Sequence, residues 1–234
     1  MARMFLRVRA PFAAFRWMQA GVYRATSPVV PPSAAWGLVL NLAGVETRAK
    51  DPGVTTLVRP DAPPLRLAVA TLRAEPPEVA TLYQQLHTYP VGASGKELKE
   101  RAHGSKYWIA PARREVLVDL DAMLGVESPD AALLGCVRDG LAGRLGGGRY
   151  GLPFAGDNNL LIDRIDVFDE APEAYWYERL HPGSSPRPGS CRLTVGIDRE
   201  DSSRTTSAVF APVETPTREP PVAAWSWTPR EPPA

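Results

Sequence analysis

Hydrophobic and polar residues alternate along four short segments of the chain, as in strands with one buried face. In the first segment, Met4, Leu6 and Val8 alternate with arginines and Phe5. Successive side chains of a strand point to opposite faces, so one face of this strand is expected in a core. The four predicted strands span residues 3–10, 65–72, 114–121 and 160–168.

Two further segments have the three- and four-residue spacing of a helix with one apolar face. The first spans residues 33–43, with Ser33 as its N-cap and Gly44 able to end it. The second spans residues 129–145 and follows Ser128, another suitable N-cap. The segments therefore occur in the order β-α-β-β-α-β.

This order predicts an α+β fold over residues 1–170 with the ferredoxin-like topology that RNA-recognition domains share. Both helices would pack on one face of an antiparallel sheet. The first strand would then present Phe5, Arg7 and Arg9 on the opposite face. That face is either a binding surface or one that solvent or another element covers, and the pattern alone favours neither.

Residues 80–113 exceed this minimal fold and are predicted to form an inserted hairpin, or thumb. Basic and aromatic residues mix here, which suits a nucleic-acid strand because cations neutralise phosphates and rings stack on bases. A long solvated loop is the alternative, although loops of this length usually bind something. The candidate RNA-binding residues of this segment are Lys96, Lys99, Arg101, Lys106 and Tyr107.

The composition changes after residue 170. Strand-like segments at 174–180 and 192–197 predict a small β region over residues 171–211. Residues 212–234 contain seven prolines, so we expect this tail to form no packed core and to lie on the surface or remain disordered.

The net charge of only +1 hides opposite charges in the two halves of the chain. Residues 1–114 contain 16 Lys and Arg against 7 Asp and Glu, a net charge of +9, whereas residues 115–234 have a net charge of −8. The first 45 residues contain five arginines and no carboxylate. A basic half of this kind fits a nucleic-acid partner.

Other features narrow the class of protein. No apolar run approaches the ~20 residues of a membrane-spanning helix, and the start lacks the apolar stretch of a secretory signal. Mitochondrial presequences are also rich in arginine, but the alternation at 3–10 favours a strand. Cys136 and Cys191 fit neither a zinc spacing nor a disulfide framework, so we expect a cytoplasmic protein without metal, cofactor or membrane.

Residues 15–44 carry the densest signal, because a basic, proline-rich loop with Arg16 and Arg24 leads directly into the first helix. The amides at the start of that helix, at Ala34 and Ala35, together with the helix dipole, would form a phosphate site. An ordinary capped helix behind a stiff loop is the other interpretation.

A second signal lies at residues 143–165, where three successive glycines, including Gly147 and Gly148, follow the second helix. They let the backbone approach a ligand, while Arg149 and Tyr150 supply a charge and a stacking ring. The glycines follow a helix rather than precede one, and no Gly-Lys-Ser/Thr comes after them. Neither a P-loop nor a dinucleotide fingerprint is therefore present.

These two segments carry a resemblance. Arg-x₇-Arg-x-Thr-Ser-Pro (16–28), then Pro-Pro-Ser-Ala-x-x-Gly-Leu (31–38) and a glycine-rich loop after the second helix, resemble the fifth Cas protein family of the RAMP superfamily. That family is the Cascade subunit that caps the 5′ end of CRISPR RNA. Residues 150–165 resemble its DevS-like subtype in particular, and the resemblance spans residues 3–168.

The resemblance implies a subunit that grips the 5′ handle of the guide and folds its thumb over the guide. Its implied partners are the CRISPR RNA, a backbone subunit of the seventh Cas family, a large subunit of the eighth Cas family and, through the complex, target DNA. The acidic half would face these proteins. By position, the handle residues would be Arg16, Trp17, Arg24, Ser27, Ser33, Gly147, Gly148, Arg149 and Tyr150.

Two alternatives remain. One branch of the family is the nuclease that matures the guide, and metal-free RNA cleavage needs a base and a cation. Among the three histidines only His103 has cationic neighbours in the sequence, on a loop poorly suited to preorganised catalysis, so we expect a non-catalytic subunit. The other alternative is an adaptor protein whose proline-rich tail recruits aromatic-lined grooves.

Overall fold

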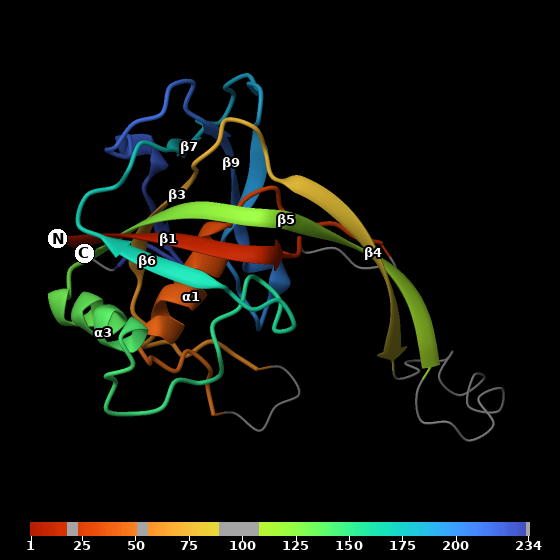
Figure 1. The fold of residues 1–234 in the computed structure, drawn as a ribbon, viewed down its shortest axis with the longest axis horizontal. Coiled ribbons are helices and arrows are strands. Elements are labelled where there is room, and N and C mark those ends of the chain that lie inside the picture. Colours follow the sequence, from red (N-terminus) through yellow and green to blue (C-terminus); the bar gives the residue numbers. More distant parts are fainter. Residues whose placement is uncertain (18–22, 51–55, 89–107, 233–234) are drawn as a thin grey trace.

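The architecture is α+β, as predicted, and a largely antiparallel sheet dominates it (Figure 1). The structure is a computed structural model that describes residues 1–17, 23–50, 56–88 and 108–232. Its helices are α1 (Pro32–Leu42) and α3 (Ala131–Leu141). Its strands are β1 (Ala2–Ala13), β2 (Tyr23–Arg24), β3 (Leu65–Thr71), β4 (Glu78–Thr88), β5 (Trp108–Ser128), β6 (Arg164–Phe168), β7 (Tyr175–Arg179), β8 (Cys191–Gly196), β9 (Thr206–Pro212) and β10 (Ser226–Thr228).

The centre of the sheet has the order β6-β1-β5-β3, and each of its neighbouring pairs is antiparallel. Strands β1 and β3 therefore run parallel on either side of β5, and α1 connects them. Strands β5 and β6 likewise flank β1, and α3 connects those two. Each helical connection thus skips one strand, so the sheet contains two split β-α-β units.

Both helices contribute to one hydrophobic core with the inner face of β1. Val39 and Leu40 of α1 and Val137 of α3 join Leu6 of β1 there. The helices approach each other closely at Gly140, where a Cβ would lie only 1.8 Å from the carbonyl oxygen of Leu42. The predicted apolar faces of both helices therefore lie in the same core.

The opposite face of β1 is covered and neutralised rather than free. The Phe5 ring is 1% exposed and packs against Trp176 of β7 at a centroid distance of 6.0 Å. Arg7 pairs with Asp121 at 2.7 Å, and Arg9 pairs with Asp166 at 2.9 Å. Another element therefore covers this face at Phe5, whereas Arg7 and Arg9 remain about one third exposed and are held in ion pairs with the neighbouring strands.

The helices begin at positions that differ from those predicted. Pro31 is the N-cap of α1, so Ser33 lies inside the helix and makes no capping bond. Asp130 rather than Ser128 caps α3, and its carboxylate accepts a hydrogen bond from the amide of Ala132. The Ser128 hydroxyl instead accepts a hydrogen bond from the amide of Asp130, the N-cap residue, and therefore binds no amide of the helix itself.

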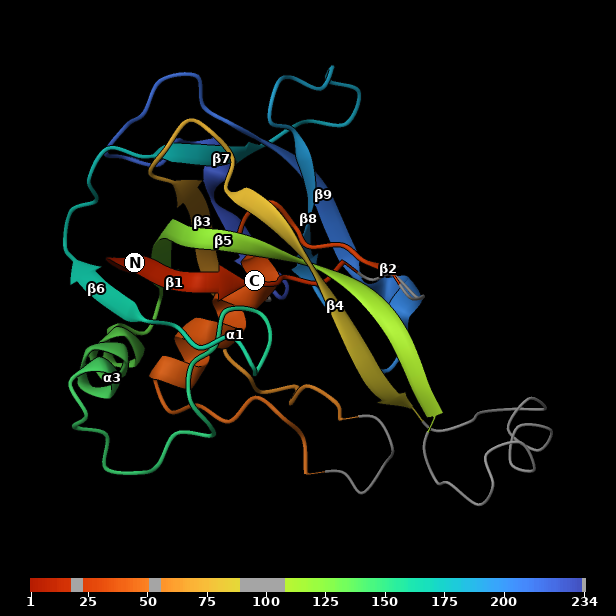
Figure 2. The ribbon, with the colours of Figure 1, turned by 45° about the vertical axis from the view of Figure 1, so that its right-hand side comes forward.

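A long hairpin leaves the body of the protein at β4 and β5 (Figures 1 and 2). Strand β5 is 21 residues long, so the strand predicted at 114–121 is only its middle. One part of β5 pairs with β1 and β3, and its beginning pairs with β4 from Glu78↔Val118 to Thr88↔Trp108. The predicted tip residues Lys96, Lys99, Arg101, Lys106 and Tyr107 lie outside the described residues.

The C-terminal part extends the same sheet through β7, β9 and β8, beyond β3. The expectation that the proline-rich tail forms no packed core is wrong. Strand β10 pairs antiparallel with β3, and Thr228 is fully buried. The Trp225 ring fills the space over Gly125, where a Cβ would lie 2.9 Å from the ring.

Candidate functional site

The structure brings the two segments singled out in the sequence together beside α1. The amide of Ala14 donates to the carbonyl of Ala155 at 3.0 Å, and Asn41 Nδ2 donates to the carbonyl of Tyr150 at 2.8 Å. Gly156 has a φ of +81°, and a Cβ there would lie 2.4 Å from the Ala14 carbonyl oxygen. The loop that follows the glycine-rich segment is therefore fixed against the end of β1 and the C-terminal end of α1.

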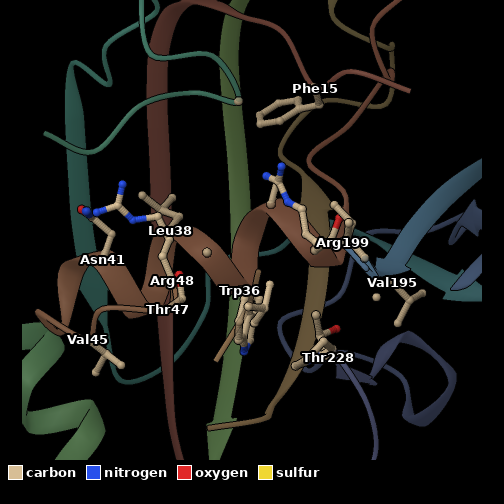
Figure 3. Close-up of a pocket in the computed structure, with 18 of the residues that line it drawn as sticks. Phe15, Trp36, Leu38, Asn41, Val45, Thr47, Arg48, Val195, Arg199 and Thr228 are labelled. Atoms are coloured by element: carbon tan, nitrogen blue, oxygen red, sulfur yellow. The ribbon is translucent and has the colours of Figure 1, made fainter. Parts of the chain in front are cut away.

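Between these segments lies a groove of about 810 Å³ (Figure 3). Its floor is the side of α1 that carries Ser33, Leu38 and Asn41. Its walls come from residues 45–48 and 56–60, from the loop 150–156, and from the segment after β8 that includes Arg199. Figure 3 shows Arg48 and Arg199 on either side of the α1 floor, so the groove carries cations on both walls.

One wall of the groove is held in place by a small charged stack. The guanidinium carbon of Arg48 lies 3.1 Å from the centroid of the Tyr150 ring. Glu46 binds the same guanidinium at 2.9 Å, and these hydrogen bonds from Arg48 lower the pKa of Glu46 to about 2. Arg48 thus covers one face of the tyrosine ring, which remains 61% exposed overall.

A cluster of three arginines lies next to this groove, where the end of β1, β2 and β5 meet. Arg16 pairs across a bridge with Thr26, and Arg24 of β2 lies beside Arg114 of β5 in parallel register. Burial lowers the pKa of Arg24, and the nearby positive charges of Arg16 and Arg114 lower it further. We call Arg16, Arg24 and Arg114 the arginine cluster.

Within the described residues, the arginine cluster has one close acidic partner. Arg114 Nη2 donates to Asp157 at 2.6 Å, and the Arg114 side chain is 7% exposed. Burial raises the pKa of Asp157, but the hydrogen bonds from Arg114 and the Asn159 amide outweigh it and leave that pKa below its ordinary value. The buried Nε of Arg24 has no hydrogen-bond partner in the described chain. The cluster therefore has an excess of positive charge and an unused donor, which favours an anionic ligand.

The structure distributes the predicted handle residues over several environments. Trp17 is 36% exposed and follows Arg16 directly in the chain. Ser27 is buried, and its hydroxyl donates to the carbonyl of Val29, so it supports the loop from within. Arg149 Nη2 donates to the carbonyl of Gly140 at 3.0 Å and ties the glycine-rich loop to α3. Gly147 and Gly148 are exposed, with open space around both.

The proposed phosphate site at the start of α1 is corrected by the structure. The amides of Ala34 and Ala35 are not free, since both donate to the carbonyl oxygen of Pro31, at 2.9 and 3.1 Å. Proline has no amide hydrogen, so Pro32 cannot replace them. The two amides on which the predicted phosphate site depends are therefore already engaged within the chain.

Sequence reasoning missed the contribution of β5 to the site. The sequence places Arg113 at the end of the predicted hairpin and Arg114 at the start of the strand 114–121, with no site role for either, yet Arg114 is the buried member of the arginine cluster. Asp157 lies within the segment 150–165, which carries the family resemblance, and nothing in its local sequence indicates an ion pair with β5. The sequence does contain a local signal for this role. Arg113 and Arg114 are adjacent in an alternating strand, so their side chains point to opposite faces. The arginine that points inward then needs a buried acidic partner.

Several kinds of site are not observed in the described part of the chain. It holds no group of three or more His, Cys, Asp and Glu side chains arranged to bind a metal ion. None of its helices has both the length and the apolar character needed to cross a membrane. His181 is the histidine whose side chain is described, and it lies exposed after β7.

Comparisons with known proteins give a consistent picture. Residues 4–145 match the family described as CRISPR-associated protein (Cas_Cas5). A solved structure titled "CRISPR RNA-guided surveillance complex" contains a chain similar to this one at a TM-score of 0.58 and 15% identity, over 95% of this chain and 96% of that one. A "Crystal structure of Cas protein" reaches a TM-score of 0.41 at 14% identity, over 92% and 95% of the two chains. No curated protein matched significantly.

Proposed function

Since the chain belongs to the Cas5 family of CRISPR-associated proteins, we propose that it is a non-catalytic subunit of a Cascade-type complex that binds the 5′ handle of CRISPR RNA. The two split β-α-β units support a ferredoxin-like, RAMP-type domain for this role. In this proposal, the hairpin of β4 and β5 corresponds to the thumb.

The observation that carries this proposal is the environment of Arg24. Its guanidinium is partly desolvated, lies close to Arg16 and Arg114, and keeps a buried Nε without a partner in the described chain. Holding like charges together in a folded protein costs free energy that a bound polyanion recovers. A phosphate of the handle placed among these side chains satisfies the free donor and relieves the repulsion.

The groove beside the arginine cluster gives the handle a path. The backbone of an RNA strand held at Arg16 and Arg24 would continue between the walls that carry Arg48 and Arg199. In this arrangement Tyr150 offers its uncovered ring face to a base. In the assembled cytoplasmic complex, the protein would contact Cas subunits of the backbone and large-subunit families and, through the complex, target DNA.

The test begins with the RNA that co-purifies with the protein, which should share a constant 5′ sequence. For that RNA, Arg24→Ala and Arg16→Ala should each weaken binding and lower the slope of log K against log salt by about one unit. Arg192→Ala, on the exposed side of β8, is the matched control and should leave the slope unchanged. If the slope of log K against log salt were unchanged in both Arg16→Ala and Arg24→Ala, the assignment of the RNA site to the arginine cluster would be wrong.

The non-catalytic part of the proposal has its own test. The purified protein should bind the guide without cutting it in a metal-chelating buffer. Specific cleavage at the handle that is lost in His103→Ala would instead assign the protein to the nuclease branch.

A further inference from the structure

Three adjacent strands at the base of the hairpin place two tyrosines on either side of an arginine. Tyr23 of β2 is paired with Arg113 of β5, and Arg113 is paired in turn with Tyr83 of β4. Pro111 is two residues before Arg113 and therefore lies on the same face of β5. These four residues surround a cavity of about 200 Å³, which we call the tyrosine slot.

The rings of the tyrosine slot are exposed and partly pre-oriented. Tyr83 is 69% exposed and Tyr23 is 49% exposed, high values for aromatic side chains in a folded protein. The Tyr23 hydroxyl donates to Glu115, which also accepts from the amide of Thr26 at 3.0 Å. The hydrogen bond to Glu115 orients the Tyr23 ring and raises the pKa of its phenol.

The charge around the tyrosine slot is positive. Arg113 is exposed and forms no ion pair with the described residues, and the next register pair along these strands is Arg24 and Arg114 of the arginine cluster. Glu115 lies close by, but two donors already engage its carboxylate. Because neighbouring residues of a strand point to opposite faces, the tyrosine slot lies on the other face of β2 and β5 from the arginine cluster, one residue away along both strands.

We propose that the tyrosine slot stacks one unpaired nucleobase of the bound RNA, with Arg113 contacting a phosphate beside that base. Every base offers a π-face to a ring or a guanidinium, so the slot needs no particular base. A single free nucleotide would occupy the slot alone, whereas an RNA strand that passes round β2, which pairs only with β5 in the described sheet, reaches both the slot and the arginine cluster. This inference rests on the proposed function and adds a defined contact at the base of the hairpin.

The experiment uses the full chain and the RNA that co-purifies with it, synthesised with 2-aminopurine at each position near its 5′ end in turn. Wild-type protein should quench one position by stacking. Tyr83→Ala should abolish that quenching and raise Kd roughly 5- to 150-fold, without the change in salt slope expected of the arginine variants. Tyr83→Phe keeps the ring and should behave as wild type.

Leu82→Ala is the matched control, since Leu82 is 41% exposed and precedes Tyr83 on the other face of β4. Equal affinity losses in Leu82→Ala and Tyr83→Ala would mean that the hairpin is merely destabilised, and would overturn the tyrosine slot. Unchanged quenching in Tyr83→Ala would overturn it as well, and so would binding of a proline-rich peptide in place of RNA. Wild-type protein that binds no RNA at all would instead remove the proposed function itself.

Discussion

The Arg114 guanidinium lies 2.6 Å from the Asp157 carboxylate and joins β5 to the loop that follows the glycine-rich segment. Both side chains are largely buried, at 7% and 18% exposure, so solvent screens the pair only weakly. This contact fixes the distance between the arginine cluster and the groove. The stability of the fold and the shape of the candidate site therefore depend on the same two residues.

Replacing Arg114 alone should be strongly destabilising. Arg114→Met leaves a mostly buried carboxylate without its partner, and we expect the free energy of unfolding to fall by on the order of 3 kcal/mol. Urea denaturation followed by circular dichroism measures this change. Arg114→Met combined with Asp157→Asn should recover a large part of the loss, because no unpaired charge remains. A double variant as unstable as the sum of the single ones would show that the pair is not coupled.

Stability should also depend on Gly156, where the loop 150–156 packs against the chain at the end of β1. Gly156→Ala introduces a Cβ that meets the Ala14 carbonyl oxygen, in addition to the cost of a positive φ. Gly151→Ala is a matched control, since its φ is +72° but no atom lies within 4 Å of the added Cβ. Thermal melting should show a loss of more than about 1 kcal/mol for Gly156→Ala and a smaller one for Gly151→Ala. Equal losses would mean that the close approach to Ala14 does not matter.

Much of the central fold follows from local pattern. The alternation in β1 and the helical stripes of α1 and α3 are short-range signals, and Leu6, Val39 and Val137 lie in the core as the pattern predicts. The N-caps of both helices were misplaced by two residues because Ser33 and Ser128 each lie near another residue able to begin a helix. Local propensity does not choose between such neighbours.

Long-range pairing accounts for what the sequence did not reveal. Arg7 and Arg9 were candidates for an open face, but their acidic partners, Asp121 and Asp166, are more than 110 positions away in the chain. The proline-rich tail was predicted not to pack, yet its strand β10 pairs antiparallel with β3. In the candidate site, the sequence places Arg16 and Arg24 in one loop, and the structure brings their charges close together, whereas the contribution of Arg114 depends on the register of β2 with β5.

The ion pair at the groove wall predicts a dependence of stability on pH. The pKa of Glu46 is lowered from 4.5 to about 2 in the folded state by the hydrogen bonds from Arg48. A lowered folded-state pKa stabilises the fold above the unfolded value, and this contribution is lost as pH falls from about 4.5 to about 2. Glu46→Gln should therefore be less stable than wild type at pH 7, and the two melting temperatures should converge near pH 2. A constant difference across this range would contradict the pairing.

The tail should contribute to stability through Trp225. Its ring packs over Gly125, and the guanidinium carbons of Arg3 and Arg66 lie 5.2 and 5.6 Å from its centroid. Trp225→Ala removes this packing and both cation–π contacts, so we expect unfolding to become easier by about 3 kcal/mol, measured by urea denaturation. Val222→Ala is the control within the same tail, because Val222 is 83% exposed and should be neutral. If Trp225→Ala were as stable as Val222→Ala, the contacts of Trp225 with Gly125, Arg3 and Arg66 would contribute nothing to the stability of the fold.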